Sequence, residues 1–260
     1  MDLKITKRIS YFFNRLARPV KLMLFLILLL NFSCTHSPDS NEGIPDVDKP
    51  ETLVKRRDDG TVSSVNQVDE NNRVNGIRVT YYGDGITIYS KQTFSHGRKE
   101  GPAIWYYMNG QVYKQSHFEE GKRQGLTRVY YKNGILSAEY KSDKGNVLPG
   151  LKEYNKDGTL ITDYPDIKFR EIEYLSTNNR VDLEISCSKK RSGVKFYMLN
   201  EKNGETSRVY LITENDSTVR RYYVQPGQTL HKKVNILAVI PTALGNLLAR
   251  EYTYQLKISN

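Results

Sequence analysis

The strongest pattern in the sequence is a repeat of 24 or 25 residues in its N-terminal half. Copies begin at Gly76, Gly101 and Gly125, and each contains a glycine, four residues, two adjacent tyrosines, one further residue, Asp or Asn, and a glycine. A fourth copy begins at Gly150, is one residue shorter and has one tyrosine. A repeat of this length is typical of arrays in which each unit is stable only against its neighbours.

Each copy contains a turn signal between two strand-like runs. The turn glycines follow Asp or Asn, and they are Gly85, Gly110, Gly134 and Gly158. Asp-Gly and Asn-Gly are preferred in a two-residue type I′ turn, because both of its central positions need a positive φ. Each copy is therefore predicted to form one β-hairpin, and glycines such as Gly97 permit the return into the next hairpin. Stacked hairpins would build a single-layer sheet over residues 51–164.

The paired tyrosines are predicted to place aromatic rings on both faces of this sheet, because adjacent residues of a strand point to opposite faces. The two columns of rings are Tyr81, Tyr106, Tyr130 and Tyr82, Tyr107, Tyr131. The open column is the candidate binding face, together with Trp105, Arg98, Lys99, Lys122 and Arg123. Rigid rings beside cations suit contacts with a peptide, a glycan or an anionic headgroup. The alternative is a cross-strand ladder of rings that stabilises a thin sheet, with the cations solvated.

This spacing resembles the bacterial variant of the MORN repeat. The shared pattern is G-x(4)-Y-Y-x-[ND]-G followed by G-[KR]-x-x-G, and it covers residues 76–150 in three full copies. The resemblance implies a β-hairpin array that acts as a scaffold for protein or lipid contacts, without catalytic residues or a cofactor. Some proteins of this family are labelled antitoxins, so the resemblance also implies a second possible role, an immunity protein that binds and neutralises a toxin.

The N-terminus has the features of an export signal. Six basic residues and one acidic residue precede the apolar run 22–30, which is shorter than the roughly 20 residues that span a membrane. Cys34 follows this run, with Ser33 before it and polar residues after it. This arrangement resembles a bacterial lipoprotein signal, in which a diacylglycerol is attached to the cysteine. The resemblance implies a signal peptide over 1–33, a flexible tether over 34–50, and a protein anchored to a membrane of the bacterial envelope, the outer one, through lipid on Cys34.

The glycine–tyrosine repeat ends near residue 164, and a different residue pattern follows. Seven short alternating runs separated by turns occupy residues 165–260, and they predict a small immunoglobulin-like β-sandwich. The segment 241–249 breaks the alternation and predicts a longer loop or one helical turn between the last two strands. If Cys34 carries lipid, Cys187 stays unpaired as a small buried hydrophobe. The predicted fold class is therefore all-β, a MORN-like hairpin array followed by the sandwich.

Charge and motif content do not favour nucleic-acid binding or catalysis. The net charge is +10, but +5 of it lies in residues 1–33, so the remainder is only mildly basic. The sequence contains no zinc-type histidine spacing, P-loop or nucleophile-elbow motif. We expect no enzyme activity, cofactor, metal or nucleic-acid partner. The sequence predicts an envelope lipoprotein that binds a protein or a glycan, and the alternative is the antitoxin-like immunity protein.

Overall fold

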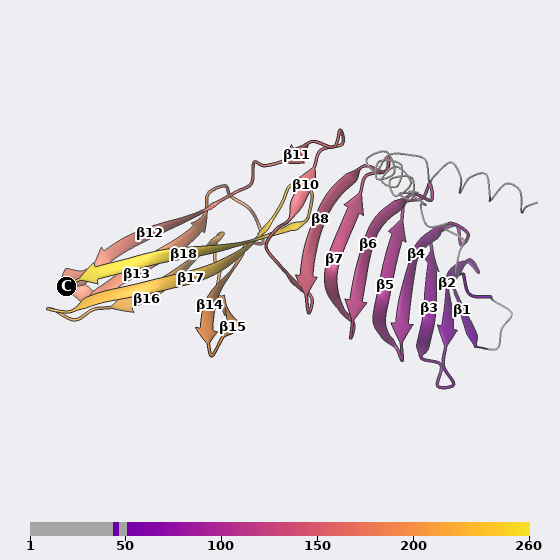
Figure 1. The fold of residues 1–260 in the computed structure, drawn as a ribbon, viewed down its shortest axis with the longest axis horizontal. Helices are drawn as coiled ribbons and strands as arrows, with labels where there is room; N and C mark the ends of the chain where they lie inside the picture. The colour runs from indigo at the N-terminus through magenta and orange to yellow at the C-terminus, as the bar shows by residue number, and fades with distance from the viewer. Residues whose placement is uncertain (1–43, 47–50) are drawn as a thin grey trace, which may run out of the picture. The chain divides into compact units, whose positions relative to one another are not determined.

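A computed structural model describes residues 44–46 and 51–260 (Figure 1). Nearly all of the regular secondary structure in this part is antiparallel strand, which confirms the predicted all-β fold class. The one helix in these ranges is the four-residue α3 (Leu175–Asn178). Within the same ranges, no helix has both the length and the apolar character needed to cross a membrane. The predicted signal peptide, Cys34 and most of the tether lie outside the described residues.

The first sheet contains eleven strands, and its first eight follow one another in chain order. Each of these eight strands pairs with the next in antiparallel orientation, as Figure 1 shows. β10 then pairs with β8 and with β11, and β9 pairs with β8. The strands are β1 (Thr52–Arg56), β2 (Val62–Val68), β3 (Val74–Tyr81), β4 (Ile88–Ser95), β5 (Arg98–Tyr106), β6 (Val112–Glu119), β7 (Lys122–Tyr130), β8 (Leu136–Asp143), β9 (Asn146–Val147), β10 (Lys152–Tyr154) and β11 (Leu160–Ile161).

The loops at the Asp-Gly and Asn-Gly edge are longer than the predicted type I′ turns. In the loop between β5 and β6, the Tyr107 N–H donates to the Gln111 carbonyl (2.7 Å) and the Gly110 N–H donates to the Tyr107 carbonyl (2.9 Å). Gly110 has a φ of 82°, whereas Asn109 does not have a positive φ. The loops at Gly134 and Gly158 repeat this pattern, and the loop at Gly85 has one residue more. The type I′ prediction is therefore wrong, because a type I turn followed by a left-handed glycine closes these hairpins.

Two-residue turns with the type I′ signature lie at the opposite edge of the sheet. His96 and Gly97 have φ values of 47° and 87°, and they join the paired residues Ser95 and Arg98. The next two turns at this edge are Glu120-Gly121 and Lys144-Gly145. The glycine N–H of each turn also donates to the backbone beside the preceding turn, as Gly97 does to the Val74 carbonyl at 2.7 Å. Neighbouring hairpins are thus bonded through their turns as well as through their strands.

Residues 167–259 form two further sheets, and their strands lie where the sequence predicts seven runs. The orders are β12-β13-β16 and β15-β14-β17-β18. The strands are β12 (Ile167–Tyr174), β13 (Arg180–Cys187), β14 (Lys195–Lys202), β15 (Glu205–Leu211), β16 (Ser217–Tyr223), β17 (Thr229–Pro241) and β18 (Leu247–Ser259). The prediction of a long loop or a helical turn over 241–249 is wrong. β17 and β18 pair up to Pro241 and Leu247, and a tight turn with Gly245 at a φ of 80° joins them.

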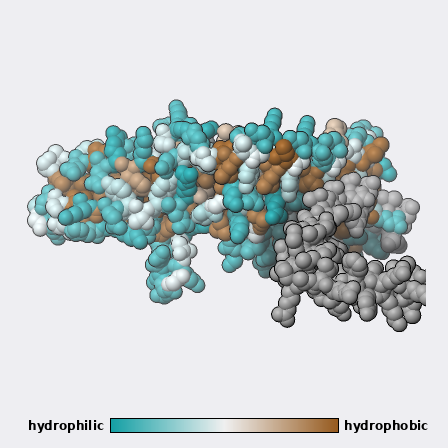
Figure 2. All heavy atoms as spheres, turned by 45° about the horizontal axis from the view of Figure 1, so that its top comes forward, coloured by the Kyte–Doolittle hydropathy of each residue, from teal (hydrophilic) through white to brown (hydrophobic). Residues whose placement is uncertain are grey.

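The two C-terminal sheets share one hydrophobic core. Leu183 of β13, Phe196 of β14 and Ile236 of β17 are fully buried in it. The same cluster continues into the first sheet through Ala138 and Tyr140 of β8. On the face drawn in Figure 2, polar side chains cover most of the surface, and apolar side chains gather in strips between them.

A buried carboxylate holds the turn between β17 and β18 against the first sheet. Glu153 of β10 is 1% exposed, and its Oε1 accepts hydrogen bonds from Thr242 Oγ1 at 2.6 Å and Asn246 Nδ2 at 2.7 Å. A buried carboxylate needs such donors, because burial removes its hydration. These bonds place residues 242–246 beside the end of the first sheet, where a pocket lies.

Candidate binding site

The first tyrosine of each pair is at least partly buried in the sheet. Tyr106 is 2% exposed and packs with Val79 and Ile88 in a small core. Tyr81 is partly buried against this core, and Tyr130 is half-buried. These rings contribute to packing of the sheet, and the ring of Tyr106 is inaccessible to a ligand.

The second tyrosine of each pair makes the same hydrogen bond in three successive hairpins. The hydroxyl of Tyr82 donates to the Tyr106 carbonyl, that of Tyr107 to the Tyr130 carbonyl, and that of Tyr131 to the Tyr154 carbonyl, each at 2.7 Å. Burial raises the pKa of Tyr82 and Tyr107, so these hydroxyls stay protonated and can donate at neutral pH. Each bond joins one hairpin to the next, and the three together form a structural ladder.

Cations and aromatic rings alternate across five neighbouring strands of the first sheet. We call this set the cation–aromatic row: Phe94, Lys99, Phe118, Arg123 and Tyr140, on β4 to β8 in order. Phe94 pairs directly with Lys99, and Phe118 with Arg123. Lys99 Nζ lies 5.1 Å from the ring centre of Phe118, and Arg123 Cζ lies 5.8 Å from that of Tyr140. Cations at these distances are attracted to the negative faces of the rings.

Two further cations lie beside this row. Arg78 Cζ is 4.8 Å from the ring centre of Phe94, and Lys114 Nζ is 5.4 Å from that of Trp105. Burial, with repulsion from Arg123 and Lys99, lowers the pKa of Lys114 to about 8. Within the described residues, neither Lys99, Lys114 nor Arg123 forms an ion pair. This face of the sheet therefore concentrates positive charge that no acidic side chain of these ranges neutralises.

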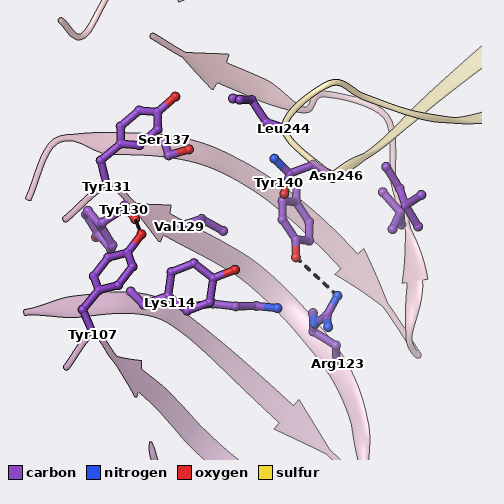
Figure 3. Close-up of a pocket in the computed structure, with 14 residues that line it drawn as sticks. Tyr107, Lys114, Arg123, Val129, Tyr130, Tyr131, Ser137, Tyr140, Leu244 and Asn246 are labelled. Atoms are coloured by element: carbon purple, nitrogen blue, oxygen red, sulfur yellow. Dashed lines mark hydrogen bonds between the residues drawn. The ribbon is translucent and has the colours of Figure 1, made fainter. Parts of the chain in front are cut away.

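A pocket of about 420 Å³ opens beside this charge, between the third hairpin of the repeat (β7 and β8) and the turn that joins β17 to β18 (Figure 3). Lys114 and Arg123 contribute cations to its lining, and Tyr140 lies between Arg123 and the turn. Tyr107 and Asn246 line the pocket from the second hairpin and from the turn. The lining thus combines two cations, aromatic rings and polar side chains. Such a set can bind an anionic group by charge and an attached ring by contact with tyrosine.

The predicted site residues fall into separate places. Trp105 lies under Lys114, beside the cation–aromatic row. Arg98 and Lys122 are exposed at the turn edge of the sheet, where Lys122 lies near Glu119. Cys187 is a half-buried free cysteine of the described region, packed against the C-terminal core. Nothing in the structure describes Cys34.

Sequence reasoning missed Arg78 and Lys114, and it did not find the aromatic partners Phe94, Phe118 and Tyr140. A signal for the phenylalanines was present, since Phe94 and Phe118 are 24 residues apart, one repeat length. The positions of Lys114 and Tyr140 depend on the register between neighbouring strands, which a single strand pattern does not contain.

No cluster of His, Cys, Asp and Glu in the described ranges could hold a metal ion. Comparison with known proteins finds no family model and no curated protein that matches the chain.

Proposed function

We propose that the chain is a lipid-anchored protein of a bacterial envelope, and that the face of its first sheet is a binding scaffold for an envelope protein or polymer. The observation that carries this proposal is the set of cations on one face of the sheet, placed over aromatic rings without acidic partners. Concentrated unneutralised charge is costly for folding and useful for recognition of an anionic partner.

The architecture supports a MORN-like array. The bond from the second tyrosine hydroxyl recurs from Tyr82 to Tyr107 to Tyr131, at intervals of 25 and 24 residues. Repetition of one stabilising contact at the period of the sequence repeat is expected for an array of equivalent hairpins. The orders β12-β13-β16 and β15-β14-β17-β18, around one core, are compatible with the proposed immunoglobulin-like sandwich.

Palmitate labelling with cell fractionation tests the proposed lipid anchor and location, with Cys34→Ala as the matched variant. The proposal expects label on the native chain in the membrane fraction and no label on the variant. Chemical cross-linking of the same two strains tests the scaffold function. The proposal expects an adduct of the native chain with an envelope partner. An unlabelled chain in the cytoplasm, cross-linked one to one with a toxin, would overturn the proposal in favour of the immunity protein.

A further inference from the structure

The pocket lies where serine replaces one tyrosine of the repeating pattern. In the first hairpin of the repeat, β3 and β4, Tyr82 packs against Tyr89 with ring centres 5.2 Å apart. In the second, β5 and β6, Tyr107 packs against Tyr113 at 5.1 Å. Ser137 stands 24 residues after Tyr113, at the same position of the third hairpin, and it lines the pocket. The third hairpin therefore lacks the second ring of the pair, and an opening remains beside it.

Arg123, one of the two cations of this pocket, is only partly supplied with hydrogen-bond acceptors. The Nε of Arg123 is buried and makes no hydrogen bond within the described part of the chain. Its Nη1 reaches only the hydroxyl of Tyr140, at 3.4 Å, a long contact (Figure 3). A guanidinium has five N–H donors in one plane, and a carboxylate offers two oxygens that match this fork. A carboxylate would therefore be a suitable acceptor for Arg123, and Lys114 would add a second positive charge beside it.

The strands that carry Lys114 and Arg123 have no free edge for an added peptide strand. β6 pairs with β5 and β7, and β7 pairs with β6 and β8, so both edges of these strands are occupied. A peptide that binds by strand addition needs a free edge. A ligand of these two cations is therefore recognised through side chains.

The remaining lining suits a sugar ring. Tyr113 is 38% exposed, and its ring presents an apolar surface with a polar tip, while Asn246 and Ser137 offer hydrogen-bonding groups. The volume lies near the lower end of the range for ligand pockets, about 300–1,000 Å³. Acyl chains would need a more apolar lining than one with two cations.

We propose that this pocket binds a carboxylate-bearing sugar residue of an acidic polysaccharide, with Arg123 and Lys114 on the carboxylate and Tyr113 against the ring. This assignment rests on the proposed scaffold function and specifies its ligand class. Lys99 and Arg78, which lie on neighbouring parts of the same sheet, would bind further acidic sugar residues of the same polymer.

Isothermal titration calorimetry of the full chain in detergent, with tetragalacturonate as the probe, tests the proposal. The native chain is expected to bind tetragalacturonate, and to bind its fully methyl-esterified form at least tenfold more weakly, because the ester removes the charge. The affinity should fall as the salt concentration rises.

Three variants locate the binding. Ser137→Tyr should abolish it, since this change restores the ring that the other two hairpins carry and fills the pocket. Arg123→Gln should weaken it at least tenfold. Lys141→Gln is the matched control, because Lys141 is an exposed cation next to Tyr140 in the same strand and does not line the pocket. Circular dichroism of each variant shows whether it is folded, and Arg123→Gln decides the matter if Ser137→Tyr does not fold.

The proposal is overturned if tetragalacturonate does not bind, or if Ser137→Tyr and Arg123→Gln bind it as the native chain does. Binding of polyglutamate or of phosphatidylglycerol vesicles in place of the sugar also overturns it. Failure of the scaffold function is distinguishable from these results. If the envelope adduct of the native chain persists while tetragalacturonate does not bind, only the sugar assignment fails.

Discussion

In the C-terminal sheets, side chains from two layers meet in one core, whereas the hairpins of the first sheet are joined by hydrogen bonds that recur along it. Leu183 and Ile236 are fully buried in the C-terminal core. In the first sheet, the small core around Tyr106 is supplemented by bonds such as that from Tyr107 to Tyr130. A sheet stabilised in this way can leave one face for charged side chains, while two sheets that share a core use their inner faces for packing.

The largest effect is expected from a cavity in the C-terminal core. Ile236→Ala should lower the free energy of unfolding by about 3 kcal/mol, because it removes buried methyl groups and leaves a void. Urea unfolding followed by circular dichroism measures this loss. Trp105, the only tryptophan, reports on the first sheet by fluorescence, and its transition should shift less. Equal shifts of both probes would show that the two regions unfold as one unit and would break the comparison.

The next largest loss of stability is expected when the contact between the two regions is removed. Glu153→Ala should cost about 2 kcal/mol, because it removes two hydrogen bonds to a buried carboxylate and leaves Thr242 and Asn246 without their acceptor. Glu139→Ala is the control, since the ion pair of Glu139 with Lys152 is open to solvent and should contribute much less than the bonds of Glu153. Similar losses in urea unfolding of both variants would contradict a special role for Glu153.

One bond of the tyrosine ladder should contribute less. Tyr107→Phe keeps the ring and removes the hydroxyl that donates to Tyr130, so the expected loss is about 1 kcal/mol. Tyr113→Phe is the matched change, because the hydroxyl of Tyr113 forms none of the three ladder bonds, and its loss should be near zero. If thermal unfolding shifts equally for both variants, the ladder does not stabilise the sheet.

The smallest effect should be a gain in stability. Lys114→Met removes a desolvated cation that faces Lys99 and Arg123, and because Lys114 is partly exposed we expect a gain of no more than about 1 kcal/mol. The same variant should bind tetragalacturonate more weakly than the native chain. A variant that is more stable and binds less would show that this charge is kept for recognition.

The pH dependence of stability follows from the same lysine. Between pH 8 and 10 the folded chain loses the proton of Lys114, whose pKa is about 8, while the unfolded chain keeps it. The unfolded state then binds more protons, so the free energy of unfolding should rise with pH in this window. Above this window, tyrosines with raised pKa, such as Tyr254 at about 12, act in the opposite direction. Urea unfolding at pH 7.5 and 9.5 measures the rise, which should be smaller in Lys114→Met.

The strands of both regions could be predicted from the sequence because glycine spacing and alternation are local signals. The turn type could not, since Asn109-Gly110 fits both a type I′ turn and a type I turn with a left-handed glycine. Strand pairing decides between them through the bond from Tyr107 to Gln111. The cation–aromatic row was out of reach for a related reason. Lys99 meets Phe118 because Gly101 of β5 pairs with Phe118 of β6, and this register is not a local signal of either strand.

The most direct test of the central claim, that the face of the first sheet carries the partner, is site-specific photo-cross-linking in cells. A photoreactive residue at Tyr113 lies beside the pocket, and one at Tyr223, which is 63% exposed on β16, is the control. The account predicts an envelope adduct from position 113 that is lost in the Ser137→Tyr background, and none from position 223. An adduct from position 223 alone would contradict it and would place the binding surface on the C-terminal sheets.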